Sequence, residues 1–222
     1  MCFTDDPSGL DADIAVKTLP EIGLREEEWY QTGVWPKLAL YKKNLQGLKG
    51  RCLFIDLDMI VLRDLDDFLS HPAAFISIDV GESWRPYAPR ANSEVGTGIF
   101  AFNIGQEAQI LDAFLADREA AKVKFNNEQS FVEEYAKSMH FWPEGWVISF
   151  KRWLRRPLGV DLFLPPKEPP EYAKIVAFHG DPRPAQLMRQ GINFWDKFPH
   201  MGHGQVGWMM DYWKRFGGTI KT

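Results

Sequence analysis

Two aspartates, separated by one leucine, lie within an apolar stretch of the chain. Asp56 and Asp58 interrupt the segment RCLFIDLDMIVL at residues 51–62, which otherwise reads as a strand buried on both faces. An unpaired carboxylate in such surroundings is costly, or it becomes protonated. Residues i and i+2 of a strand point to the same side, so the two charges would repel each other. The pattern indicates a divalent-cation site, and oxygen ligands favour Mg²⁺ or Mn²⁺.

The same pair is also compatible with roles that need no metal. The two carboxylates could be solvated at a strand end or paired with Arg51 or Arg63, and a D-x-D motif is weak evidence by itself. An apolar strand ending in D-x-D is also typical of haloacid-dehalogenase-like phosphatases, in which the first aspartate is the nucleophile and the second a general acid/base. That class needs a later acidic pair. No acid follows Gly180-Asp181 at the right distance, so the phosphatase remains the alternative enzyme class.

Strands and helices that could position these residues alternate along the chain. Apolar alternation predicts strands over 13–19, 51–62, 73–78, 96–103 and 174–178. Helical spacing and capping residues predict helices over 35–43, 106–117, 126–135 and 206–216. This alternation predicts an α/β layered sheet, and open α/β sheets bind their ligands at the carboxyl ends of the strands.

Composition restricts the class of protein. The 222 residues are 45% hydrophobic and 25% charged, which is typical of a globular chain, and the net charge of −4 gives no support for nucleic-acid binding. Of the two cysteines, Cys52 lies in the apolar segment and is expected to be a buried free thiol, so we expect a reducing, cytoplasmic location. No transmembrane segment or signal peptide is apparent. The aromatic tail, 186–222, is expected to pack on the same domain; a dimer face or a peripheral membrane contact is the lesser alternative.

Five segments, in order, resemble those of GT-A-fold glycosyltransferases, especially glycosyltransferase family 8, the glycogenin and bacterial galactosyltransferase type. The segments are WPKL at 35–38, CLFIDLDMIVLRDLDDF at 52–68, GTGIFAFN at 96–103, NEQ at 127–129 and IVAFHGDPRP at 175–184. The resemblance implies a GT-A-like fold over residues 1–185, with a mixed, mostly parallel sheet and helices on both faces. It also implies a hexosyltransferase that moves a sugar, with retention, from a nucleotide-diphosphate donor to an unknown acceptor.

The resemblance also implies roles for particular residues. Those expected to hold Mn²⁺ or Mg²⁺ are Asp56, Asp58 and His179; those expected to bind the donor are Lys37, Asp56, Gly180 and Arg183; and the catalytic candidates are Glu128 and Gln129. Each residue also has an ordinary structural alternative. An acid in the first turn of a helix complements the helix dipole, and a lysine or arginine at a loop is usually solvated.

The chain departs from the family pattern at three places. The family's metal-binding histidine aligns with Ala177, although His179, two positions later, shares its face of the strand. Gly96 stands at the family's asparagine, and Arg183 stands at its lysine. The first strand and helix of the family also have no clear counterpart, so we expect an N-terminally truncated domain. A non-catalytic sugar- or nucleotide-binding relic is therefore the non-enzyme alternative.

Overall fold

The computed structural model describes residues 1–29, 33–81, 84, 93–161, 163–194, 201–203 and 205–217. The chain forms two compact units that alternate along the sequence. Unit 1 consists of Met1–Leu53, Pro72–Ile76 and Phe100–His140, and unit 2 consists of Phe54–His71, Ser77–Ile99 and Phe141–Thr222. The predicted tail, 186–222, therefore belongs to the same unit as Asp56 and Asp58.

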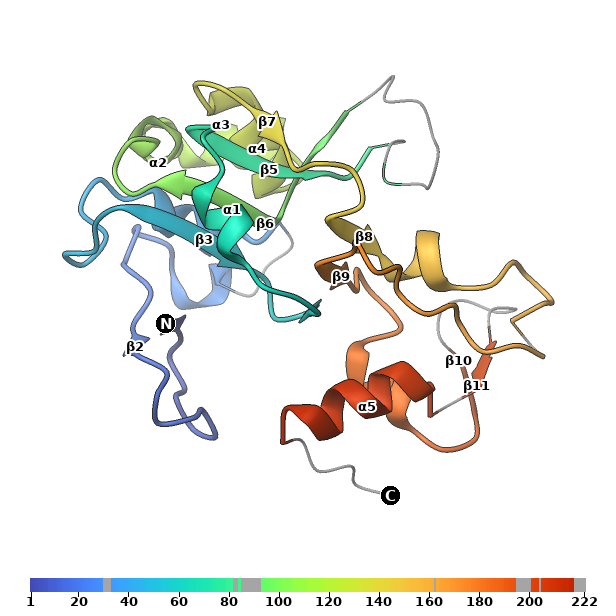
Figure 1. The fold of residues 1–222 in the computed structure, drawn as a ribbon. Helices are drawn as coiled ribbons and strands as arrows, with labels where there is room; N and C mark the ends of the chain where they lie inside the picture. Colours follow the sequence, from blue (N-terminus) through green and yellow to red (C-terminus); the bar gives the residue numbers. More distant parts are fainter. Residues whose placement is uncertain are drawn as a thin grey trace. The chain divides into compact units, whose positions relative to one another are not determined.

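Unit 1 is mainly helical. It contains β1 (Cys2–Phe3), β2 (Val16–Lys17), the 3₁₀ helices η1 (Glu26–Glu28) and η2 (Trp35–Tyr41), and the helices α2 (Ala108–Ala116), α3 (Arg118–Lys124) and α4 (Glu128–Tyr135). Figure 1 shows α2, α3 and α4 gathered together. The helices predicted over 106–117 and 126–135 are confirmed. Asn127 caps α4 by accepting a hydrogen bond from the Ser130 N–H, which is why the helix begins at Glu128.

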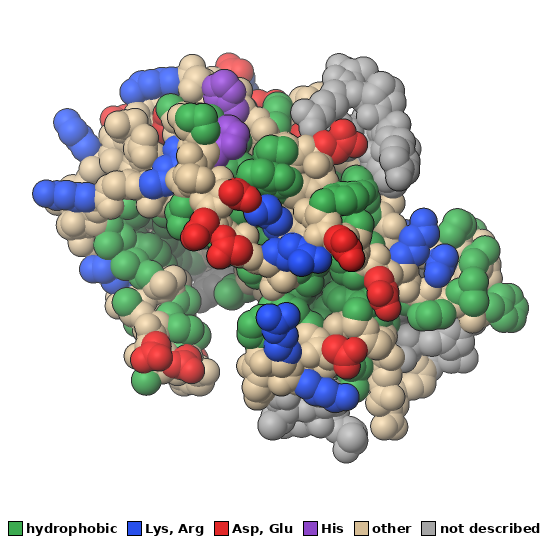
Figure 2. Space-filling view, in the orientation of Figure 1, with side chains coloured by type: hydrophobic (Ala, Val, Ile, Leu, Met, Phe, Trp, Pro, Cys, Tyr) green, Lys and Arg blue, Asp and Glu red, His purple; other side chains and the backbone are tan. Residues whose placement is uncertain are grey.

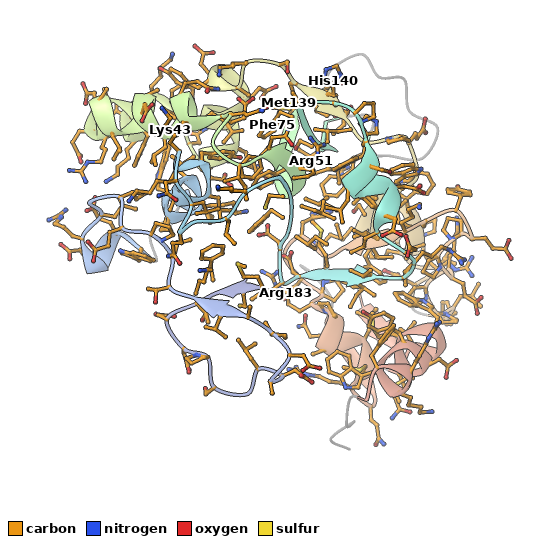
Figure 3. The ribbon with its side chains drawn as sticks, turned by 60° about the vertical axis from the view of Figure 1, so that its left-hand side comes forward. Lys43, Arg51, Phe75, Met139, His140 and Arg183 are labelled. Atoms are coloured by element: carbon orange, nitrogen blue, oxygen red, sulfur yellow. The ribbon has the colours of Figure 1, made fainter. Side chains whose placement is uncertain are left out.

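Aromatic side chains fill the core of unit 1. Tyr41, Phe75, Phe100 and Phe102 are fully buried, and their ring centroids lie 5.3–6.4 Å apart; Phe75 is labelled in Figure 3. Ring pairs at such distances add specific contacts to the burial of a large apolar area. The spacing of apolar residues in η2 therefore reflects packing against this core.

Unit 2 is built around a small mixed sheet. Its elements are β4 (Met59–Val61), α1 (Asp66–Ser70), β8 (Val147–Ser149), the single π-helical turn η4 (Phe150–Leu154), β9 (Ile175–Ala177), the 3₁₀ helix η5 (Pro184–Met188), β10 (Ile192–Phe194), β11 (Met201–His203) and α5 (Gly207–Arg215). Strand β9 lies between β4, to which it is antiparallel, and β8, to which it is parallel. Val206 and Met209 at α5 pack with Ile148 and Val176 in one apolar core, so the helix predicted over 206–216 is confirmed, although Phe216 at its end is 62% exposed.

A four-stranded sheet completes the architecture. Its strand order is β3 (Arg51–Ile55), β6 (Val95–Asn103), β5 (Phe75–Asp79) and β7 (His140–Phe141), and each strand carries residues of both units. The class is thus mixed α/β. The described pairings include both parallel and antiparallel neighbours, so they do not support a mostly parallel sheet.

The prediction of one continuous strand over 51–62 is wrong. The segment divides into β3 and β4, which belong to different sheets, with the two aspartates in the turn between them. The residues of β3 are only half-buried, so this is not a strand buried on both faces. The acids interrupt the apolar run because the chain turns there.

The two cysteines are free thiols. Cys52, expected to be a buried free thiol, is half-buried, and burial raises its pKa, which disfavours the reactive thiolate. No helix within the described ranges has the length and apolar character needed to cross a bilayer.

The buried carboxylate of Glu28, in unit 1, is expected to make the stability of the protein depend on pH. Glu28 is 7% exposed, pairs with Lys122 and accepts a 2.7 Å hydrogen bond from the Arg25 N–H. These contacts, the Lys122 hydrogen bond foremost, lower the pKa of Glu28 from 4.5 to about 2. The depressed pKa means that the stabilisation is complete above pH 4.5 and is lost as the pH falls toward 2. Thermal unfolding midpoints should therefore place wild type above Glu28→Gln at pH 7, and the gap should close toward pH 2.

Glu134→Gln is the matched control for that measurement, because Glu134 is more than half exposed on α4. Its difference from wild type should be small at neutral pH. A gap between wild type and Glu28→Gln that stayed constant from pH 7 to pH 2 would contradict the assignment.

Candidate functional site

The Asp56–Asp58 turn is held by backbone hydrogen bonds on both sides. The Asp56 N–H donates to the Gly98 carbonyl at 2.8 Å, and the Asp58 carbonyl accepts from the Phe178 N–H at 2.9 Å. Leu57 is 98% exposed, whereas both aspartates are half-buried. The turn thus projects its leucine into solvent and holds Asp58 beside the end of β9.

Arg183 supplies the positive charge that faces Asp58. Its Nη1 donates to Oδ2 of Asp58 and, at 3.4 Å, to the Phe178 carbonyl; Figure 3 labels this arginine. The Arg183 side chain remains 52% exposed, and Asp58 is 30% exposed. A pair this exposed contributes little to folding stability.

His179 directly follows the same strand end. Its Nε2 lies 2.6 Å from Oγ of the buried Ser149, and the Trp84 ring lies 4.8 Å from its own ring. Burial lowers the pKa of His179, and the positive charges of Lys151 and Arg152 lower it further. The histidine is therefore neutral near pH 7, with one ring nitrogen engaged by a hydroxyl.

Gly180 forms a left-handed turn close to a lysine. Its φ is +73°, a conformation that side chains other than glycine rarely adopt. A Cβ at this position would lie 3.4 Å from the Lys151 Nζ, so the ammonium group sits directly over the glycine backbone. Lys151 and Arg183 thus place two cations beside the His179-Gly180 turn, which suits an anionic ligand.

Gly98 and Gly96 differ in the atoms that a side chain at each position would meet. A Cβ on Gly98 would lie 3.6 Å from Oδ2 of Asp56 and 2.6 Å from Cε of Met59, so glycine leaves space beside the carboxylate. A Cβ on Gly96 would lie 2.3 Å from Cγ1 of Val80. Close packing therefore explains why Gly96 stands where the family has asparagine.

The remaining predicted residues belong to unit 1. Lys37 Nζ lies 3.4 Å from Oε1 of Glu128, and their side chains are 12% and 3% exposed. Gln129 follows in the first turn of α4 and is half-buried. The structure thus joins the predicted donor-binding lysine to the predicted catalytic glutamate as a buried ion pair. Within unit 1, this pairing gives Glu128 a structural role of its own.

The residues predicted to hold a metal do not form a cluster of ligands within the described ranges. Throughout the ranges that the structure describes, no three His, Cys, Asp or Glu side chains gather closely enough to bind a metal ion. In this arrangement Asp58 pairs with Arg183 and His179 with Ser149, and the role of Asp56, Asp58 and His179 as ligands of Mn²⁺ or Mg²⁺ stays a prediction.

A small pocket of about 30 Å³ lies within unit 2. Its lining includes Ile78, Asp79, Trp84, Trp142, Glu144 and Trp153. The Trp153 Nε1 donates to the Trp84 carbonyl at 3.0 Å, and Trp84 also contacts His179. The indole N–H of Trp84 is buried and makes no hydrogen bond within the part of the chain that the structure describes. The pocket and the strand end that carries His179 thus share one tryptophan.

Sequence reasoning identified most of these groups but missed their connections. Unit 2 brings together Asp58, His179, Gly180 and Arg183, while unit 1 holds Lys37, Glu128 and Gln129. Ser149 was not predicted. The only sequence signal for it is a serine at the end of an apolar strand that is followed by Lys151 and Arg152.

Comparisons with known proteins give little further information. No protein-family model matches the chain, and no curated protein is detectably similar to it. Among solved structures, the chain is similar to the glycosyltransferase GlyE of Streptococcus pneumoniae TIGR4, with 11% sequence identity and a TM-score of 0.48. The match covers 84% of this chain and 44% of that one, so the chain spans less than half the length of that structure.

Proposed function

We propose that the protein is a glycosyltransferase that takes a sugar from a nucleoside-diphosphate donor. The observation that carries this proposal is the group of charges at the end of β9, where Arg183 faces Asp58 and Lys151 lies over Gly180. Such a pair of cations suits a diphosphate, which carries adjacent anionic groups. The five family-like segments, in order along the chain, favour a sugar donor over other diphosphates.

The proposed chemistry uses these cations to stabilise the leaving group. As the bond between the sugar and the diphosphate breaks, negative charge develops on the diphosphate oxygens. Arg183 can donate two parallel hydrogen bonds to such oxygens, and Lys151 can act as a point charge. Neutral His179, fixed by Ser149, orients the turn without adding a third positive charge. Glu128 and Gln129 remain the candidates that the resemblance proposes for the catalytic group facing the sugar, and Lys37 for a donor contact.

Metal dependence is kept separate from this mechanism. The proposed stabilisation of the leaving group uses Arg183 and Lys151, because Asp58 pairs with Arg183 and His179 with Ser149. Mn²⁺ or Mg²⁺ at Asp56 and Asp58 stays a proposal from the sequence, to be measured by adding and chelating each ion in the assay below.

The test is hydrolysis of a panel of nucleoside-diphosphate sugars by wild type and Asp58→Ala. Removing the carboxylate releases the guanidinium from its position, so release of the nucleoside diphosphate should fall at least about tenfold. Asp112→Ala, which changes an exposed aspartate on α2, is the matched control and should keep wild-type activity.

The same assay separates the alternatives. Release of phosphate from an aryl phosphate, lost in Asp56→Asn, would replace the transferase with the phosphatase. Binding of a donor without any turnover would indicate the non-catalytic relic. Equal hydrolysis by wild type and Asp58→Ala would contradict the proposed site.

A further inference from the structure

A compact loop projects from the end of η4 in unit 2. The Lys167 N–H donates to the Leu154 carbonyl at 2.7 Å, and the Arg156 Nε donates to the Pro165 carbonyl at 3.0 Å. Both bonds close the loop at its base. We name residues 155–167 the basic loop; residue 162 lies outside the described ranges. A loop closed in this way holds its outward side chains in a defined arrangement.

The basic loop exposes an unusual concentration of large apolar side chains. The exposed fractions are 82% for Phe163, 57% for Leu158, 47% for Leu164 and 40% for Val160. Scattered apolar residues are normal at a protein surface, but four within seven residues form a patch of the kind that marks an interaction surface. Figure 2 shows hydrophobic side chains gathered at the right-hand margin of the view, with Lys or Arg side chains beside them.

The surroundings of the patch are positively charged. Residues 150–167 carry five basic side chains against one acidic side chain, although the whole chain has a net charge of −4. Arg152, just before the loop, and Lys167, its last residue, are both exposed. The single acid within these residues, Asp161, is 3% exposed and accepts a hydrogen bond from the Gly159 N–H, so it offsets little of the charge, whereas the exposed Glu168 follows Lys167 directly.

The positive charge around the patch favours a lipid bilayer over a second copy of the chain as its binding partner. Two copies of the chain that met symmetrically through the patch would bring the arginines of one against those of the other, which is unfavourable. An anionic lipid bilayer, whose interior is apolar, would bind both the apolar and the basic side chains of the patch. Apolar side chains enter such an interface while neighbouring basic groups remain at the level of the lipid headgroups.

We propose that the basic loop is a peripheral binding site for anionic phospholipid bilayers. Leu158 and Phe163 enter the acyl region, and Arg152 and Lys167 contact the headgroup phosphates. This inference is tested without substrate, so its outcome does not depend on the glycosyl-transfer proposal, although Lys151, one of the five basic residues, also belongs to the proposed donor site.

The experiment is flotation of the full chain with vesicles of phosphatidylcholine alone or with 30% phosphatidylglycerol. Wild type should float with the anionic vesicles at least about tenfold more than with the neutral ones, and 0.5 M NaCl should weaken the binding. Leu158→Asp/Phe163→Asp should reduce binding about tenfold or more. Arg152→Gln/Lys167→Gln should produce a loss of similar size on anionic vesicles alone.

Val123→Asp is the matched control, because Val123 is 89% exposed on α3, in unit 1. It should float like wild type. Failure of wild type to float with either vesicle, or unchanged flotation of both double variants, would overturn the proposal. Gel filtration that showed a larger species, abolished by Leu158→Asp/Phe163→Asp while no vesicle bound, would assign the patch to self-association instead.

Discussion

Arg183→Ala should weaken the binding of nucleoside diphosphates by roughly tenfold to a hundredfold. Charge-assisted hydrogen bonds contribute about 1.5–3 kcal/mol each, and the arginine is half-exposed beside the anion-binding turn at Gly180. Isothermal titration with UDP, GDP and ADP measures the loss. Arg183→Lys should recover part of it, because lysine keeps the charge but cannot form the two parallel bonds.

Arg189→Ala is the control for this experiment, since Arg189 is an exposed arginine just after η5 in the same segment. Its affinity should match wild type. The unfolding midpoint of Arg183→Ala should change little, as expected for an exposed pair. Unaltered affinity in Arg183→Ala would show that the diphosphate does not bind at the end of β9.

Lys37→Met should destabilise the protein by about 3–5 kcal/mol, the largest stability effect that we expect. The ammonium lies 3.4 Å from the Glu128 carboxylate, and both side chains are largely buried. Removing one partner of a buried ion pair leaves the other charge uncompensated, which is far more costly than replacing both. Denaturant unfolding of wild type and variant gives the free energy directly.

The double variant Lys37→Met/Glu128→Gln tests whether the uncompensated charge of Glu128 causes the loss of stability. It should be more stable than Lys37→Met alone, because the stranded charge is removed together with its partner. A double variant as unstable as the sum of the single changes would show that the two residues act independently. Donor hydrolysis by the stable double variant then reports separately on the proposed catalytic role of Glu128.

Local signals in the sequence predicted individual elements well. Helix α4 begins where Asn127 can cap it, and β6 starts within one residue of the strand predicted over 96–103, although it is buried on both faces instead of alternating. Residues 51–62 were misassigned because an apolar run does not reveal a turn when the turn itself contains a leucine. The exposure of Leu57 is set by pairing with residues far along the chain, which periodicity does not register.

The sequence predicts which residues belong to the candidate site but not which of their side chains pair with each other. Asp58, His179 and Arg183 were identified from motif positions, yet the motif assigned two of them to a cation. The structure instead pairs Asp58 with Arg183 and His179 with Ser149. The second pairing depends on the register of β8 against β9, which places Ser149 opposite Ala177. Register across a sheet is a tertiary property, and a single sequence contains no direct signal for it.

The pairing of Asp58 with Arg183 also has a consequence for synthesis of the chain. The two residues are 125 positions apart, so the aspartate leaves the ribosome long before its partner is made. Contacts between such distant residues form late in folding, after more local structure is in place. A growing chain therefore carries the acidic turn without its arginine until β9 and the segment after it have emerged. The anion site is expected to be among the last parts of the newly made protein to mature.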